Sequence, residues 1–236
     1  MSSIEEKINL NKAMLPQVGS LGAHYDKWVH APSPKSSFRL FESNILEFFS
    51  RTYWFVVPLV WVPVALALLF VSASCAQSSP FFVDSICSHL TMAERALTPP
   101  QVLWCAITGI LLWTLIEYCL HRFLFHLKAE SPGLITFHFM IHGLHHKFPH
   151  DHMRLVFPPV PAAIIAGLLY LPFLAFLPLQ ISRALLGGAL LGYIGYDMIH
   201  YYVHHGTNPQ LNYFAALKAD HMDHHFRIPN KGDDED

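Results

Sequence analysis

Four groups of histidines between residues 121 and 225 are the side chains of this chain best suited to do chemistry. They read HRFLFH, HGLHH, HYYVHH and HMDHH. A buried imidazole without a partner costs free energy, and neutral imidazole is the commonest metal ligand in proteins, so this density of histidine indicates metal binding. One ion takes only about four to six ligands, so the sequence predicts two metals. The candidate ligands are His121, His126, His142, His145, His146, His200, His204, His221, His224 and His225.

The spacing within each group predicts how its imidazoles are presented. Residues at i, i+3 and i+4 share a face of a helix, and the last two point about 100° apart around its axis. One HxxHH triplet could therefore serve two neighbouring metals, and His200 and His204, four residues apart, share a face. His121 and His126 would point about 140° apart on an ideal α-helix. We expect them to reach different metals or to straddle a helix end.

Two carboxylates precede histidine groups by one helical turn. Glu117 lies before His121, and Asp197 stands in the same relation to His200. A carboxylate at this spacing could hydrogen-bond a ligand imidazole and orient it. For Glu117 the alternative, a side chain that extends to the membrane interface, is equally compatible with the sequence.

The composition indicates a membrane protein in which helices position these groups. Hydrophobic residues make up 53% of the 236 residues and charged residues only 14%. The net charge of −2 offers no general attraction to nucleic acid, and we expect no such partner. We predict an all-α integral membrane protein with about four transmembrane helices, although prolines in the third apolar run also allow a helical hairpin there. The predicted spans lie near residues 53–75, 101–120, 156–179 and 184–203.

If each apolar run crosses once, every histidine group lies on one side of the membrane, in residues 121–155 and 200–226. Of the 15 lysines and arginines, all but Arg95 and Arg183 lie on that side. The positive-inside rule then predicts that the metal site and both termini are cytosolic. We expect a cytosolic segment over residues 1–52, with an amphipathic helix at Phe38–Phe49 on the bilayer surface, followed by a membrane domain over residues 53–236 that carries the dimetal site.

The four histidine groups, in this order and with these gaps, resemble the fatty acid hydroxylase superfamily of membrane dimetal oxygenases. The flanking residues resemble the fatty acid 2-hydroxylase branch. These are YDKWVH and LFES near the N-terminus, EY before the first group, FHF before the second, RLVFPP after it, GYDMIH leading into the first histidine of the third group, and HFR at the end of the fourth group.

This resemblance implies hydroxylation at the alpha carbon (C2) of long or very long fatty acyl chains for sphingolipid (ceramide) synthesis in the endoplasmic reticulum membrane. Molecular oxygen would be the co-substrate. Electrons would come from cytochrome b5 and its reductase in trans, because this chain shows no cytochrome b5 domain and no place for haem. The family's metal ligands map onto the ten histidines above, and His138 and His205 match further motif positions as supporting residues. Iron is expected for the chemistry, although zinc can occupy the same imidazole sites.

Three alternatives stay open. A sterol C4-methyl oxidase or desaturase would use a similar histidine site on another lipid. A membrane zinc-binding or transport protein would place ionisable ligands near the bilayer midplane, whereas these lie at the ends of the apolar runs. An inactive, C-terminally shortened form is the third alternative, because the family continues after the last HxxHH whereas this sequence ends in Asp233–Asp236.

Overall fold

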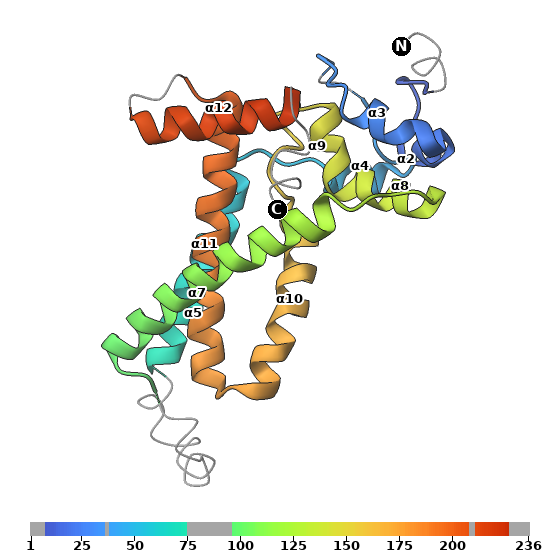
Figure 1. Cartoon of the computed structure of the whole chain (residues 1–236). Helices are drawn as coiled ribbons and strands as arrows, with labels where there is room; N and C mark the ends of the chain where they lie inside the picture. Colours follow the sequence, from blue (N-terminus) through green and yellow to red (C-terminus); the bar gives the residue numbers. More distant parts are fainter. Residues whose placement is uncertain (1–7, 36–37, 75–95, 208–210, 227–236) are drawn as a thin grey trace. The chain divides into compact units, whose positions relative to one another are not determined.

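Every regular element of the described part of the chain is helical, which confirms the predicted all-α class (Figure 1). This computed structural model describes residues 8–35, 38–74, 96–207 and 211–226. Arg95 and the acidic residues 233–236, on which two of the expectations above depend, lie outside these ranges. The chain forms two compact units: residues 1–54, 118–158 and 198–236 make up unit 1, and residues 55–117 and 159–197 make up unit 2.

Unit 2 contains the long apolar helices. Three helices of the described chain are long and apolar enough to cross a membrane: α5 (Val56–Ser74), α7 (Pro99–Cys119) with its continuation to Phe125, and α10 (Pro159–Phe176). Because α10 continues through Pro172 as one helix, the hairpin alternative for the third run was wrong. The fourth predicted span falls on α11 (Leu179–His205), which is long enough but more polar and is not among the three.

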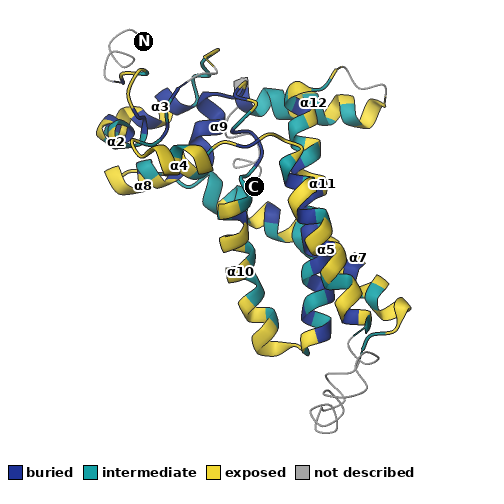
Figure 2. Ribbon diagram, turned by 180° about the vertical axis from the view of Figure 1, so that it is seen from behind, coloured by how far each residue is buried: buried dark blue, intermediate teal, exposed yellow. Residues whose placement is uncertain are grey.

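Helices α7 and α11 approach each other closely, backbone against backbone, at two glycines. A Cβ added to Gly188 of α11 would lie 2.2 Å from the carbonyl oxygen of Ala106 in α7, and one on Gly109 of α7 would lie 2.3 Å from the Leu185 carbonyl oxygen. Elsewhere in this unit, apolar helix surface is exposed rather than packed against other helices. Only 6% of the apolar window of α10 is buried, and its surface is mostly exposed in Figure 2. Exposed apolar surface of this extent suits contact with lipid rather than water.

Unit 1 is built on a core that joins the N-terminal residues to the HGLHH segment. The N-terminal helices are α2 (Leu15–Val18), η1 (Gly19–His24) and α3 (Tyr25–Val29). They pack against the helical stretch formed by α8 (Pro132–His138), η4 (Phe139–Gly143) and α9 (Leu144–Lys147). Buried apolar side chains fill the contact, which fixes the backbone that carries the second histidine group of the sequence. They include Met14, Val18, Leu21, Trp28, Val29, Ile135, Phe139, Leu144 and Phe148.

The predicted amphipathic helix at Phe38–Phe49 is shorter in the structure, where α4 spans only Asn44–Phe49. Ser43 caps it, because the Leu46 N–H donates to the Ser43 hydroxyl. The residues before Ser43 run without helix, and their backbone N–H groups at Leu40 and Phe41 both donate to the Glu47 carboxylate at 2.9 Å. That carboxylate therefore satisfies two backbone N–H groups of the extended residues just before the helix.

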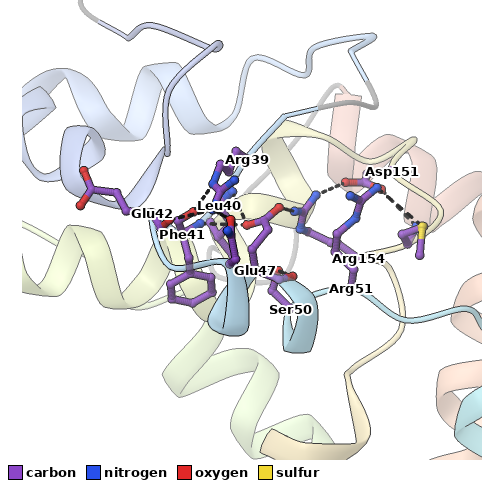
Figure 3. A network of polar contacts seen from close by, with 11 residues as sticks. Arg39, Leu40, Phe41, Glu42, Glu47, Ser50, Arg51, Asp151 and Arg154 are labelled. Carbon is purple, nitrogen blue, oxygen red and sulfur yellow. Dashed lines mark hydrogen bonds and ion pairs between the residues drawn. The ribbon is translucent and has the colours of Figure 1, made fainter.

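An ion-pair network connects α4 to the loop after α9 (Figure 3). Glu47 pairs with Arg154, whose guanidinium also donates to Asp151 at 2.9 Å and lies 4.7 Å from the ring centre of Phe38. All three charged side chains are largely buried. The apolar side chains Ile45 and Phe48 of α4 are more than two-thirds exposed. Contact of α4 with a bilayer surface stays a prediction.

Candidate metal centre

The structure gathers nine of the ten candidate histidines into two groups, both within unit 1. The first group contains His145, His200, His204, His221 and His225, and its ligand atoms all lie within 4.8 Å of one another. They come from α9, the end of α11 and α12 (Asn212–Phe226). The Nε2 atom of His221 lies 3.1 Å from that of His200, 2.8 Å from that of His204 and 3.1 Å from that of His225. Five ring nitrogens thus converge on one small volume.

The second group contains His121, His126, His142 and His224, again with ligand atoms within 4.8 Å of one another. The tenth histidine, His146, is adjacent: its Nε2 lies 2.9 Å from that of His142, and its ring centre lies 4.8 Å from that of His224. Each HxxHH triplet contributes to both groups. This is the division of a triplet between two neighbouring sites that helix geometry allows.

His121 and His126 lie in the same group, so the expectation that they would reach different metals was wrong. Residues Leu120–Phe125 form a π-helical turn, η3, in which the His126 N–H donates to the His121 carbonyl oxygen at 3.2 Å. Closing the hydrogen bond over five residues instead of four brings positions i and i+5 to the same side. The two ring centres are 4.6 Å apart. The alternative expectation, that the pair straddles a helix end, fits, because His126 follows the last residue of this turn.

The nitrogen spacing fits metal ligation. Neutral imidazoles cannot all donate to one another, yet the closest Nε2 pairs of the first group lie 2.8 to 3.1 Å apart. Two nitrogens at about 2.1 Å from one ion and at right angles to each other are about 3.0 Å apart, whereas a tetrahedron spaces them by about 3.4 Å. The first group therefore fits an ion with more than four ligands. Within the described part of the chain, the buried Nε2 atoms of His126 and His224 have no hydrogen-bond partner, as expected for ligand atoms.

Burial keeps these imidazoles neutral, which is the form that binds metal. Loss of solvent, followed by the proximity of His121, lowers the pKa of His126 to about 3 and that of His224 to about 4. Desolvation, with neighbouring histidines contributing less, holds the pKa values of His142, His145 and His146 well below the ordinary imidazole value. The chain thus presents uncharged nitrogen donors at neutral pH.

The four supporting residues named from the sequence lie outside both groups. The Nδ1 of His138 is hydrogen-bonded to the hydroxyl of Tyr25 at 2.6 Å, and His205 packs on the ring of Tyr201 at 4.9 Å. Within unit 2, Glu117 is hydrogen-bonded to Tyr196, and Asp197 to Tyr193. A role for these four in orienting ligand histidines stays a prediction.

Three residues near the second group had no signal in the histidine spacing. Tyr25 bonds to His138, Lys147 lies buried beside His146, and the ring of His30 meets that of His146 edge-on at 5.2 Å. His30 is also hydrogen-bonded locally to Asp26. Its place beside the candidate ligands depends on a contact across more than 100 residues, which the sequence does not reveal.

Comparison with known proteins places these groups in context. A sequence model of the fatty acid hydroxylase family matches residues 106–233, which include all ten histidines. The human fatty acid 2-hydroxylase is 42% identical over 231 residues, which are 97% of this chain and 61% of the human protein. The chain thus spans about three-fifths of the length of that relative.

Relatives from other kingdoms match in the same way. A dihydroceramide fatty acyl 2-hydroxylase of Arabidopsis thaliana is 41% identical over 226 residues, covering 95% of this chain and 86% of the plant protein. A solved structure of full-length Scs7p, in which only the hydroxylase domain is visible, superimposes with a TM-score of 0.76 at 31% identity. It covers 97% of this chain and 81% of that one.

Proposed function

Because the chain belongs to the fatty acid hydroxylase family, we propose that it hydroxylates the alpha carbon (C2) of long or very long fatty acyl chains that enter sphingolipids. The observation that carries the proposal is the pair of histidine groups, with five and four convergent ring nitrogens. The names of the relatives supply the lipid class, since the human relative is a fatty acid 2-hydroxylase and the plant relative acts on dihydroceramide acyl chains.

The reaction converts one C–H bond next to the carbonyl into C–OH. One oxygen atom of O2 enters the product, and the other leaves as water with two electrons and two protons. When bound, two redox-active metals would supply the activation of O2, and iron is the ion we propose, with zinc able to occupy the same nitrogens. We propose that cytochrome b5 and its reductase supply the electrons.

The contribution of the chain's own residues is to hold the metals. His145, His200, His204, His221 and His225 would hold one ion, and His121, His126, His142 and His224 would hold the other, with His146 beside both groups. The lowered pKa values of His126, His145 and His224 keep these ring nitrogens free of protons at cellular pH, so metal binding there need not compete with protonation.

The location follows from the same proposal. The three apolar helices support a multi-pass membrane protein. With α11 as a fourth crossing, we propose that it lies in the endoplasmic reticulum membrane with the histidine groups and both termini cytosolic. Residues 1–52 would form the cytosolic N-terminal segment, and residues 53–236 the membrane hydroxylase domain. Antibody access to a tag at either terminus, after selective permeabilisation of the plasma membrane, tests the orientation. Tags protected until the internal membranes are opened would contradict it.

The activity is tested in cells that lack fatty acid 2-hydroxylase. Expression of the chain should restore 2-hydroxy acyl chains in sphingolipids, measured by mass spectrometry. Substituting one ligand from each group, as His145→Ala and His224→Ala, should abolish the product. His24→Ala is the matched control, because His24 is exposed and lies outside both groups. A metal-loaded protein that leaves sphingolipids unchanged but oxidises sterols would overturn the assignment in favour of the sterol-type alternative.

A further inference from the structure

The segment Tyr25–Ser33, which contains α3 and the turn after it, contacts the backbone that carries the second histidine group. The contact is close enough to require glycine at residue 143. A Cβ there would lie 2.4 Å from the Tyr25 hydroxyl and 3.1 Å from a methyl of Val29. Besides this packing, two polar connections join the segment to individual ligand histidines.

The first connection runs from Tyr25 to His126. Tyr25 is 2% exposed, and its hydroxyl lies 2.6 Å from Nδ1 of His138. The His138 ring is also hydrogen-bonded to the backbone of Phe125. A neutral imidazole has one donor and one acceptor, so Tyr25 donates to Nδ1 and the Phe125 carbonyl accepts from the other side of the ring. Phe125 immediately precedes His126, and the connection therefore reaches the end of the π-helical turn that places His126.

The second connection runs from the turn after α3 to His146. The Lys147 ammonium donates to the Ala31 carbonyl oxygen at 2.6 Å and lies 4.7 Å from the ring centre of Trp28. In the opposite direction the Ser33 N–H donates to the Lys147 carbonyl oxygen at 2.8 Å. A buried ammonium is costly unless it is compensated, and here a carbonyl and an aromatic face compensate it. Lys147 directly follows His146. These hydrogen bonds therefore fix both the backbone and the side chain of the residue next to His146.

On the basis of the proposed dimetal function, we propose that Tyr25 and Lys147 are positioning residues: Tyr25 orients His126 of the second group, and Lys147 orients the adjacent His146. Neither residue supplies a ligand atom. They act through His138 and through the backbone of α9, in the way that outer hydrogen bonds orient ligands elsewhere. Only one member of the first group, His145, lies on α9, whereas its other four members lie on α11 and α12, outside these connections.

The test measures metal affinity, independent of turnover. The purified full chain is stripped of metal and titrated with Zn²⁺ and Co²⁺ against a chelator of known affinity. Tyr25→Phe removes only the hydroxyl, and Lys147→Met removes only the charge from a side chain of similar length. Each should weaken the affinity for one of the two bound metal ions by about 10- to 100-fold and weaken the affinity for the other by clearly less. Lys147→Arg keeps a cation above Trp28 and should recover most of the loss.

Leu21→Ala is the matched control, because Leu21 lies in the same core at 2% exposure and carries no polar group. It should lower thermal stability without separating the two metal affinities. If Tyr25→Phe does not fold, the comparison of Lys147→Met with Lys147→Arg carries the test alone. Unchanged affinities in Lys147→Met, or equal losses at both ions, would overturn the inference.

Failure of this inference is distinguishable from failure of the proposed function. An unsubstituted chain that binds fewer than two ions would contradict the dimetal function itself. A chain that binds two ions and restores 2-hydroxy lipids, while its variants keep both affinities, would contradict only the positioning roles.

Discussion

Replacement of Arg154 by methionine should strongly destabilise unit 1. Arg154 is 3% exposed and stands between the carboxylates of Glu47 and Asp151, which are 13% and 3% exposed. Methionine keeps the apolar stem over Phe38 but leaves two buried carboxylates facing each other without a cation. Breaking a buried ion pair from one side costs about 3–5 kcal/mol. For a chain of this length about 2–4 °C is lost per kcal/mol, so we expect the melting temperature to fall by about 6–20 °C.

The assay is thermal unfolding of the detergent-solubilised chain, followed by far-ultraviolet circular dichroism. Arg51→Met is the matched control, because Arg51 is exposed and its guanidinium donates to the sulfur of Met153 rather than to a buried carboxylate. It should change the melting temperature by no more than about 2 °C. Adding Glu47→Gln to Arg154→Met should recover part of the loss, since the amide oxygen can still accept from Leu40. Equal melting temperatures for Arg154→Met and Arg51→Met would refute the reasoning.

Three further predictions concern helix packing, metal content and pH. Gly188→Ala should destabilise unit 2 by about 1–3 kcal/mol and lower the melting temperature, because the added Cβ would meet the backbone of Ala106. Gly195→Ala is the control: no heavy atom lies within 4 Å of its added Cβ, so the melting temperature should change little. Elemental analysis of the purified chain should find two transition-metal ions, and a chelator should lower the melting temperature until metal is restored; a chain stable and metal-free as isolated would contradict this. In the folded, metal-free protein the pKa values of His126 and His224 are lowered to about 3 and about 4. Below about pH 6.5 the unfolded chain therefore binds more protons than the folded chain, and the melting temperature should fall from there toward pH 4. A flat profile would show that these imidazoles are not buried.

The histidine spacing predicted much of the site because its information is local. Residues three and four apart on a helix share a face, so HxxHH already implies that one triplet can face two ions, and the structure divides both triplets in this way. The same rule failed for His121 and His126, because it assumes an α-helix and the chain forms a π-helical turn there. No residue type in HRFLFH marks such a turn.

Non-local contacts account for the other differences. Tyr25 meets His138 across 113 positions and Lys147 meets Ala31 across 116, so neither contact leaves a periodic pattern. The short helix α4 has the same cause, because Glu47 bonds to Arg154 and to the backbone before Ser43 rather than extending the helix. Apolar length predicted α5, α7 and α10 well, since a membrane-crossing helix depends mainly on its own composition.

The π-helical turn at Leu120–Phe125 separates the spacing of a motif from the geometry that it encodes. In a regular α-helix, imidazoles four residues apart would occupy one face, as His200 and His204 do. Here one additional residue is accommodated by widening the turn, and the two rings still lie together. A sequence with HxxxH and a sequence with HxxxxH can therefore build the same pair of ligands, provided that the backbone changes with the insertion. Motif length alone is then a poor criterion for separating histidine-rich enzymes that share a site.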